Sequence, residues 1–188
     1  MELDEIYEKY KTDPRLDSMR KPGIKFVPGK GPLNPDIMLI GEAPGSLENA
    51  KQEPFQGKAG KYLKELLEYM ELNRADIFIT NAVKYWPLTN EIPPETRQPD
   101  NNEIGYSRFY LAREIEIVKP KIIGLCGYSA IRALFPAVQD VNSNHGALLA
   151  DKYVPLYHPA IIGYKSHMRG KVKKGYKMLT EYLIQKGV

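Results

Sequence analysis

The chain has 188 residues, 43% of them hydrophobic, so it is long enough to bury a core and we expect a single domain over residues 1–188. One cysteine, Cys126, excludes an internal disulfide framework and a metal site built from several cysteines. No apolar run is long enough to cross a bilayer, and the polar start MELDEIYEKYK is not a secretory signal. We therefore expect a cytoplasmic protein that does not associate with membranes.

The net charge of +4 is unevenly distributed along the chain. The segment from Gly163 to Val188 contains seven Lys or Arg residues and one Glu. A cationic stretch of this kind attracts polyanions such as nucleic acid. The same pattern also fits the solvated face of an amphipathic helix, so charge alone does not decide between the two.

Apolar runs that alternate with helical periodicity predict an α/β fold. A polar helix is expected over residues 2–12, followed by an irregular segment to residue 34 with one short extended run at 24–27. From residue 35 the core pattern predicts strands at 36–40, 76–80, 121–126 and 153–156, helices around 63–70, 104–118, 129–135 and 171–186, and a strand-like turn at 146–150. This alternation predicts a three-layer α/β/α sandwich with a central four-stranded, mainly parallel sheet.

Four side chains with useful chemistry lie at or after the ends of these strands. Glu42 follows the first strand in GEAPG, and Phe55 lies further on in EPFQGKAG. Asn81 ends the second strand, and His158 follows the last. Because the carboxyl ends of parallel strands meet at one edge of a sheet, where ligands bind, we expect these four side chains to converge.

Each of these side chains has a ligand-binding interpretation and an ordinary one. Phe55 lies in a polar, glycine-flanked segment and could stack on a base, a contact of about 1–3 kcal/mol, or could fold back into the core. The Asn81 carboxamide could pair with O4 and N3–H of uracil or could satisfy backbone groups. Glu42 could be an exposed acid at a helix start, and His158 a structural histidine. GEAPG lacks the glycine spacing of a dinucleotide site and the GK[ST] of a P-loop, so neither cofactor is indicated.

Taken in order, GEAPG, EPFQGKAG, ITNAVK and HPA resemble the motifs of the uracil-DNA glycosylase superfamily, in particular its family-4 type. The resemblance spans residues 36–165 and includes PKIIGLCGYSA and the HG pair at 145–146. It implies an enzyme that hydrolyses the N-glycosidic bond of flipped-out deoxyuridine in single- or double-stranded DNA and leaves an abasic site for base-excision repair. Two alternatives stay open: a glycosylase of this fold for hypoxanthine or xanthine, and a non-catalytic DNA-binding accessory protein.

The resemblance also implies roles for individual residues. Glu42 would position or activate water and His158 would donate to uracil O2, while Phe55 and Asn81 would bind the base. The remaining expected contacts are Gly41 and Ala43 in the uracil site, backbone amides of Gly127 and Ser129 on a phosphate, and Pro159, Ile161, Ile162, Lys165 and Arg169 on DNA. Ile161 or Ile162 would be a wedge that fills the hole left by the flipped base.

One departure from the family pattern concerns a cofactor. Family-4 enzymes usually carry four cysteines that bind an iron–sulfur cluster, but here Tyr85 stands at the third position, Ser107 at the fourth, and no cysteine precedes Cys126. We therefore expect no iron–sulfur cluster, and no metal or organic cofactor. The loop over 86–102 would be held by other packing, from Tyr85, Trp86 and its prolines, and we expect a monomer.

Overall fold

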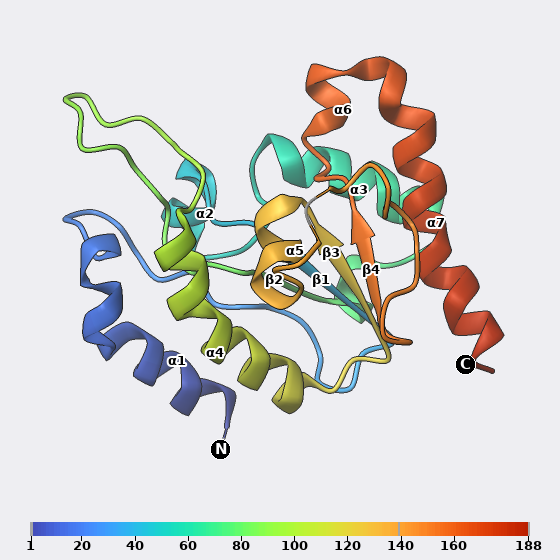
Figure 1. Ribbon diagram of the computed structural model, residues 1–188, viewed down its shortest axis with the longest axis horizontal. Helices are drawn as coiled ribbons and strands as arrows, with labels where there is room; N and C mark the ends of the chain where they lie inside the picture. Colours follow the sequence, from blue (N-terminus) through green and yellow to red (C-terminus); the bar gives the residue numbers. More distant parts are fainter. Residues whose placement is uncertain (1, 139, 188) are drawn as a thin grey trace.

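A single parallel sheet forms the centre of the molecule (Figure 1). The structure is a computed structural model that describes residues 2–138 and 140–187, so positions 1, 139 and 188 of the expected domain lie outside it. The strands are β1 (Ile37–Gly41), β2 (Phe78–Asn81), β3 (Ile122–Cys126) and β4 (Tyr153–Leu156), in the order β2-β1-β3-β4. The predicted α/β sandwich with a four-stranded sheet is confirmed, and every strand pair is parallel.

Helices cover both faces of this sheet (Figure 1). They are α1 (Leu3–Thr12), α2 (Ser46–Lys51), α3 (Lys58–Tyr69), α4 (Asn101–Val118), α5 (Tyr128–Leu134), α6 (Ile161–Tyr164) and α7 (Arg169–Gln185), with 3₁₀ turns at Pro14–Met19, Arg74–Asp76 and Ser166–Met168. The longest, α4, begins where the Asp100 carboxylate accepts the N–H groups of Asn102 and Glu103. It ends at Val118, because Lys119 adopts a left-handed conformation before Pro120.

The alternation of side chains along β1 divides the core into two layers. Met38 and Ile40 pack with α1, α4 and α5 on one face. Ile37 and Leu39 point to the other face and pack with α3 and α7. Successive strand residues point to opposite faces, so a strand buried on both faces is apolar throughout. This is why the short run at 36–40 was recognisable as a central strand.

Short or irregular segments account for the differences from the predicted elements. The run at 24–27 is not a strand; Val27 donates its N–H to Lys84 O, and only Lys30 forms an isolated antiparallel bridge, with Ile79. The run at 146–150 is also not a strand, apart from one bridge between Leu149 and Tyr153. Helices α2 and α6 were not predicted, because six and four residues are too few to show a helical period. Within the described ranges, no helix combines the length and the apolar character that a membrane span requires.

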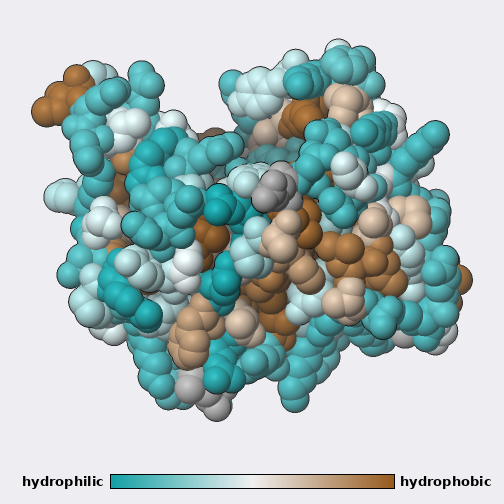
Figure 2. Space-filling view, in the orientation of Figure 1, coloured by the Kyte–Doolittle hydropathy of each residue, from teal (hydrophilic) through white to brown (hydrophobic). Residues whose placement is uncertain are grey.

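Two protrusions stand at the carboxyl edge of the sheet (Figure 1). One is the loop over residues 87–99, here termed the arm, and the other contains α6 and the start of α7. Figure 2 shows a notch between them. The arm is braced as expected by Trp86, whose Nε1–H donates to Thr96 Oγ1 at 3.0 Å. An unpredicted brace is the paired contact of the Arg97 guanidinium with the Glu103 carboxylate, at 2.6 and 2.7 Å.

Candidate active site

A cleft of about 940 Å³ lies at the carboxyl edge of the sheet, between the base of the arm and α6. Glu42, Phe55, Asn81 and His158 all line it. The other lining residues come from α2 and its flanks (Ala43–Glu48), from Gly57–Ala59, from the arm (Pro87, Thr96–Pro99) and from Ala160, Ile161 and Tyr164. The structure therefore brings together the four side chains that the sequence placed at or after strand ends.

Glu42 follows β1 at the point where the strand order reverses between β1 and β3, which is where α/β sheets form a ligand crevice. Its carboxylate packs on Gly127, the residue after β3. A Cβ on Gly127 would lie 2.5 Å from Glu42 Oε1, and Gly127 has φ +97°, so only glycine fits there. The N–H of Ser129 donates to the same Oε1 at 3.3 Å. The half-buried carboxylate is thus held against the start of α5 while it faces the cleft.

The expected phosphate contact at Gly127 and Ser129 is wrong, because both amides have other partners. The Gly127 N–H donates to Leu156 O at 2.8 Å, which extends the β3–β4 pairing. The Ser129 N–H is directed at Glu42. The Ser129 amide therefore positions the carboxylate, while the Gly127 amide completes the strand pairing.

Asn81 ends β2 directly beside Gly41 at the end of β1. Its side chain is 4% exposed, and the described residues supply no hydrogen-bond partner for its carboxamide, which lines the cleft. The unpaired amide atoms open into the cleft, so their one acceptor and two donors are available to a ligand. Gly41 makes room for it, since a Cβ there would lie 2.3 Å from Asn81 Oδ1 and 2.7 Å from the Phe55 ring.

Phe55 is held with its ring in the cleft by a loop in an uncommon conformation. Its φ of +55° is left-handed, which costs about 1–2 kcal/mol for a residue with a Cβ. The ring lies nearly parallel to that of His158, at 26° with centroids 5.8 Å apart. The Phe55 carbonyl approaches Gly60, where a Cβ would lie 2.0 Å from the oxygen. Strain of this kind persists only where the surrounding structure imposes it, and it is common at ligand sites.

Glu48 imposes this loop conformation, a role that sequence reasoning missed. Its Oε2 accepts the Gly45 N–H at 3.1 Å, and its Oε1 accepts the N–H groups of Gln56 and Gly57 at 2.9 Å each. One buried carboxylate therefore ties the GEAPG turn to the Phe55 loop. The three-residue spacing from Gly45 to Glu48, which matches a capping box, was the available signal.

His158 follows β4 and presents a neutral imidazole to the cleft. The Ala160 N–H points at its Nδ1 at 3.4 Å, so the neutral ring carries its proton on Nε2. Burial lowers the pKa of His158, although the charges of Glu42 and Glu48 oppose the shift. Because the ordinary pKa is about 6.5, the lowered value leaves the ring uncharged at pH 7.

A second histidine fixes the strand end that carries His158. The Tyr157 N–H donates to His145 Nδ1 at 3.1 Å, and His145 Nε2 bonds to the Lys171 carbonyl on α7 at 3.1 Å. The ring packs so closely on Gly175 that a Cβ there would lie 2.1 Å from its Nε2. His145 is thus a link between β4 and α7, outside the cleft.

A buried polar cluster lies beneath Asn81. Lys84 Nζ donates to the Asn81 carbonyl at 2.8 Å, to Glu114 Oε2 at 2.6 Å and to Thr80 Oγ1. Glu114 also accepts from Tyr7 O–H at 2.5 Å and is fully buried on α4. Burial lowers the pKa of Lys84 and the Glu114 carboxylate opposes this shift, while burial raises the pKa of Tyr7. This cluster ties the end of β2 to α1 and α4.

Comparison with known proteins agrees with this arrangement. The family model of the uracil DNA glycosylase superfamily matches residues 28–183. The chain belongs to this superfamily. It is therefore a glycosylase, an enzyme that hydrolyses N-glycosyl bonds, and it binds DNA as its substrate.

Relatives of the glycosylase match most of the chain. It is 30% identical to a type-4 uracil-DNA glycosylase of Archaeoglobus fulgidus, over 95% of this chain and 92% of that protein. It is 34% identical to one of Sulfurisphaera tokodaii, over 84% of this chain and 74% of that protein. A DNA polymerase of Bacillus phage SP01 is 31% identical over 77% of this chain, which corresponds to 15% of the polymerase.

The structure corrects several of the expected DNA contacts of the glycosylase. Ile162 is 1% exposed and belongs to the core with α3 and α7, so it is not a wedge. Pro159 is buried and does not line the cleft. Arg169 forms a surface ion pair with Glu65, which also holds Lys173 Nζ at 3.0 Å, and its contact with DNA stays a prediction. Ile161 lines the cleft, and Lys165 is exposed on the α6 protrusion.

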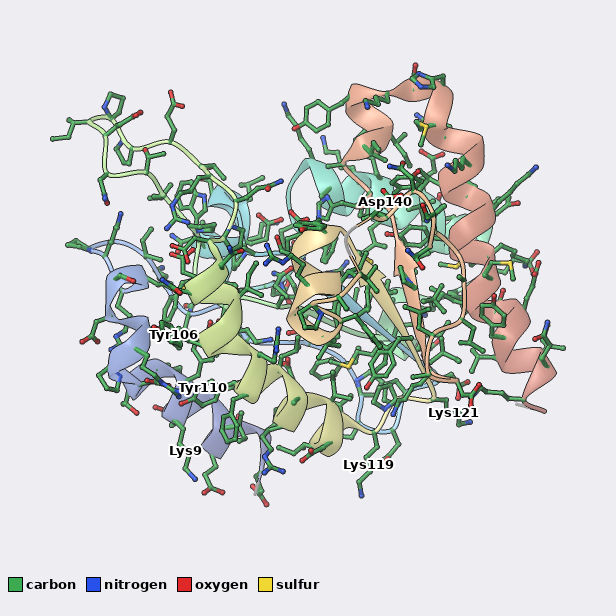
Figure 3. All side chains as sticks on the ribbon, in the orientation of Figure 1. Lys9, Tyr106, Tyr110, Lys119, Lys121 and Asp140 are labelled. Carbon is green, nitrogen blue, oxygen red and sulfur yellow. The ribbon has the colours of Figure 1, made fainter. Side chains whose placement is uncertain are left out.

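The residues at the expected cluster positions of the glycosylase do not fit an iron–sulfur cluster. Tyr85 packs on Tyr10 with ring centroids 5.8 Å apart. Ser107 Oγ forms a hydrogen bond of 2.7 Å with the Tyr10 hydroxyl. Figure 3 shows the neighbouring Tyr110 of α4 near α1. Cys126 is buried in β3, where burial raises its pKa to about 12. Across residues 2–138 and 140–187, no three His, Cys, Asp or Glu side chains are grouped to hold a metal ion.

Proposed function

We propose that this glycosylase excises uracil from DNA, in single strands and duplexes, as a cytoplasmic monomer acting in base-excision repair. The observation that carries the proposal is the Asn81 carboxamide, which has no hydrogen-bond partner among the described residues and faces a cleft shared with Phe55 and His158. Uracil offers an acceptor and a donor side by side on its Watson–Crick edge, and a carboxamide matches both.

Binding of the base uses the rigid part of the site. The target nucleotide leaves the DNA stack and enters the cleft, at a cost of a few kcal/mol that is smaller for mismatched or single-stranded DNA. The Phe55 ring offers a stacking surface, and Asn81 pairs with O4 and N3–H. Because Glu48 fixes the Phe55 loop and Lys84 fixes the Asn81 backbone, little ordering remains to occur on binding.

Cleavage of the C1′–N1 bond sends its electron pair into the uracil ring, and negative charge accumulates on O2. The neutral His158 donates Nε2–H to this oxygen. A fixed donor contributes more as the charge grows, so it stabilises the transition state above the ground state. The lowered pKa of His158 suits this role, because the ring remains a neutral donor and Nδ1 stays an acceptor for Ala160.

Glu42 acts on the sugar side of the reaction. Its carboxylate faces the cationic character that develops at C1′, as in glycoside cleavage, and accepts a hydrogen bond from water. The water oxygen bonds to C1′, and its proton passes to Glu42 and then to solvent. The uracil anion takes up one proton from solvent, and the products are free uracil and an abasic site.

The competing substrates are other deaminated bases. We expect uracil to be excised faster than hypoxanthine or xanthine, as the names of the relatives indicate. The Asn81 carboxamide alone does not distinguish the three bases, because each offers an adjacent C=O and N–H. The measurement is cleavage of labelled oligonucleotides by alkali after incubation with the protein, one lesion in each, in single strands and duplexes. No cleavage at uracil in any substrate would reject the proposal, and faster release of a purine would reassign the site to that base.

We also propose that the glycosylase works without an iron–sulfur cluster. The aromatic packing of Tyr10, Phe26, Tyr85 and Tyr110 supports this, because these rings join α1, α4 and the residues after β2. Protein purified without oxygen should contain less than about one iron per four chains and no absorption band near roughly 400 nm, because a cluster needs several thiolate ligands. Stoichiometric iron and sulfide would contradict the proposal.

A further inference from the structure

A second groove, of about 440 Å³, adjoins the active-site cleft at Phe55. Among the described residues, Phe55 is the only one that lines both the cleft and the groove. The rest of the groove wall comes from Gln56, from α3 and from the turn that follows α3, with Leu67 and Leu72 as its apolar part. The groove is therefore a separate hollow that shares one aromatic residue with the catalytic centre.

The wall of this groove carries more positive than negative charge. It contains three cationic side chains, Lys61, Lys64 and Arg74, and one carboxylate, Glu68, which gives a net charge of 3 − 1 = +2. Lys61 is exposed and has no ion-pair partner among residues 2–138 and 140–187. Lys64 Nζ lies 3.8 Å from Glu68 Oε1, but both side chains are mostly exposed, and such a contact compensates little charge. The groove is thus suited to an anion.

Arg74 is the least exposed of the three cations. One of its N–H groups donates to the Pro54 carbonyl at 2.6 Å, and within the described ranges no carboxylate lies within ion-pair distance of the guanidinium. Burial lowers the pKa of Arg74, and no neighbouring charge opposes this shift. A guanidinium has five N–H donors in a planar arrangement that matches a phosphate group. The donors that Pro54 does not use are available to such a ligand.

Helix α3 carries cations from the cleft to the groove. Lys58, at its first position, lines the cleft, whereas Lys61 and Lys64 line the groove. Residues three apart are neighbours on the surface of a helix. The row from Lys58 to Lys64 extends about 9 Å along the helix axis at 1.5 Å per residue. One DNA strand carries a phosphate about every 3.4 Å along the axis of a duplex, so the row is long enough to meet two or three phosphates.

We propose that Lys58, Lys61, Lys64 and Arg74, here termed the α3 track, bind the phosphates of the uracil-containing strand on one side of the flipped nucleotide. The proposal rests on the proposed function. The strand leaves the cleft beside Lys58 and crosses the start of α3. Its phosphates then meet the cations of the groove, and its sugar carbons contact the apolar wall. Since Arg74 also holds Pro54, the residue before Phe55, the bound phosphate lies close to the support of the stacking ring.

The first test measures the affinity of the protein for uracil-free single-stranded DNA over a range of salt concentrations. Lys61→Gln and Lys64→Gln each remove one charge from an exposed position and keep most of the side chain. Each change should weaken binding about fivefold in about 0.1 M salt and flatten the slope of log K against log salt by about 0.7, the share of one phosphate contact in a single strand. The double variant should flatten the slope by about 1.4.

The matched control is Lys119→Gln. Lys119 is exposed and precedes β3 at the amino edge of the sheet, away from the cleft and the groove (Figure 3). This change should leave the slope as it is in the unchanged protein. Slopes that stay the same in both α3 variants, or that flatten equally in Lys119→Gln, would overturn the proposal.

The second test locates the contact on the strand. Single phosphates on either side of uracil are replaced in turn with neutral methylphosphonates, and kcat/KM for uracil excision is measured for each substrate. We expect a loss of about fivefold at one or two neighbouring positions on one side of uracil only. In Lys61→Gln or Lys64→Gln, neutralising the phosphate that the missing lysine contacts should cost less than about twofold more, because one interaction cannot be lost twice.

Fully additive losses at every position would mean that these lysines do not contact the phosphates beside uracil, and would overturn the proposal. Lower affinity of both variants for free deoxyuridine monophosphate, with DNA binding unchanged, would assign the groove to a free nucleotide instead. Should the unchanged protein excise no uracil, the proposed function fails separately. The salt dependence on uracil-free DNA then decides alone whether the α3 track binds DNA.

Discussion

Replacing His158 with alanine is expected to lower the single-turnover rate of uracil excision by about 10²- to 10³-fold, the usual effect of removing one donor to a developing oxyanion. The donor is the Nε2–H of a neutral ring that the Ala160 N–H and the end of β4 hold in place. DNA affinity should change much less, because the donor contributes mainly in the transition state. The measurement pairs a rapid-quench excision assay with a binding titration on the same duplex.

The control variant is His167→Ala, which removes an exposed histidine of the same segment that does not line the cleft. The pH dependence gives a second check. Because burial lowers the pKa of His158, the ring is already neutral at pH 7, and the excision rate should stay level from about pH 6.5 to 8. A tenfold fall for each pH unit across this range would mean that the charged ring is the active form. Loss of binding without loss of the excision rate would contradict the assigned role.

Replacing Glu114 with alanine is expected to lower the free energy of unfolding by about 3–5 kcal/mol, the usual cost of leaving one partner of a buried ion pair uncompensated. The change leaves the Lys84 ammonium without its carboxylate partner and removes the acceptor of the Tyr7 O–H. Urea denaturation at pH 7 measures the effect. Glu116→Ala on the same helix is the matched control. Its contact with Arg113 is exposed, so this change should lower the free energy of unfolding by less than about 1 kcal/mol.

Lys84 also holds the Asn81 carbonyl, so the same cluster bears on the active site. Glu114→Gln keeps the shape of the side chain and part of its hydrogen bonding, and we expect a smaller loss of stability. It provides a folded variant in case Glu114→Ala does not fold. If both Glu114 variants lowered the free energy of unfolding by less than about 1 kcal/mol, the buried pair would contribute no more to stability than the exposed pair of the control.

The sequence predicted the sheet and the four convergent side chains for the same reason. Strands buried on both faces are short, continuous apolar runs, and parallel strands bring their carboxyl ends together whatever the loop lengths between them. Glu42 and Asn81 could therefore be placed without any knowledge of the intervening helices. The position of the Phe55 ring was harder to predict, because it depends on the left-handed backbone conformation of Phe55 and on the Glu48 carboxylate.

The residues that were misplaced depend on partners distant in the sequence. Ile162 and Tyr164 belong to one turn of helix, and only packing against α3 and α7 decides which is buried. The Gly127 amide was assigned to phosphate because its β4 partner, Leu156, cannot be read from the local sequence. The ion pair between Arg169 and Glu65 could not be predicted from the local sequence either, since the two residues lie more than a hundred positions apart. Glu114 carries no local signal at all, since nothing near it on α4 marks a buried carboxylate.

The most direct measurement is a crystal structure of the protein grown with free uracil. We expect the pyrimidine ring to stack on Phe55, with O4 and N3 within about 3 Å of the Asn81 carboxamide and O2 facing His158 Nε2. Uracil bound outside this cleft, or a cleft filled by the protein's own side chains in the presence of saturating uracil, would contradict it.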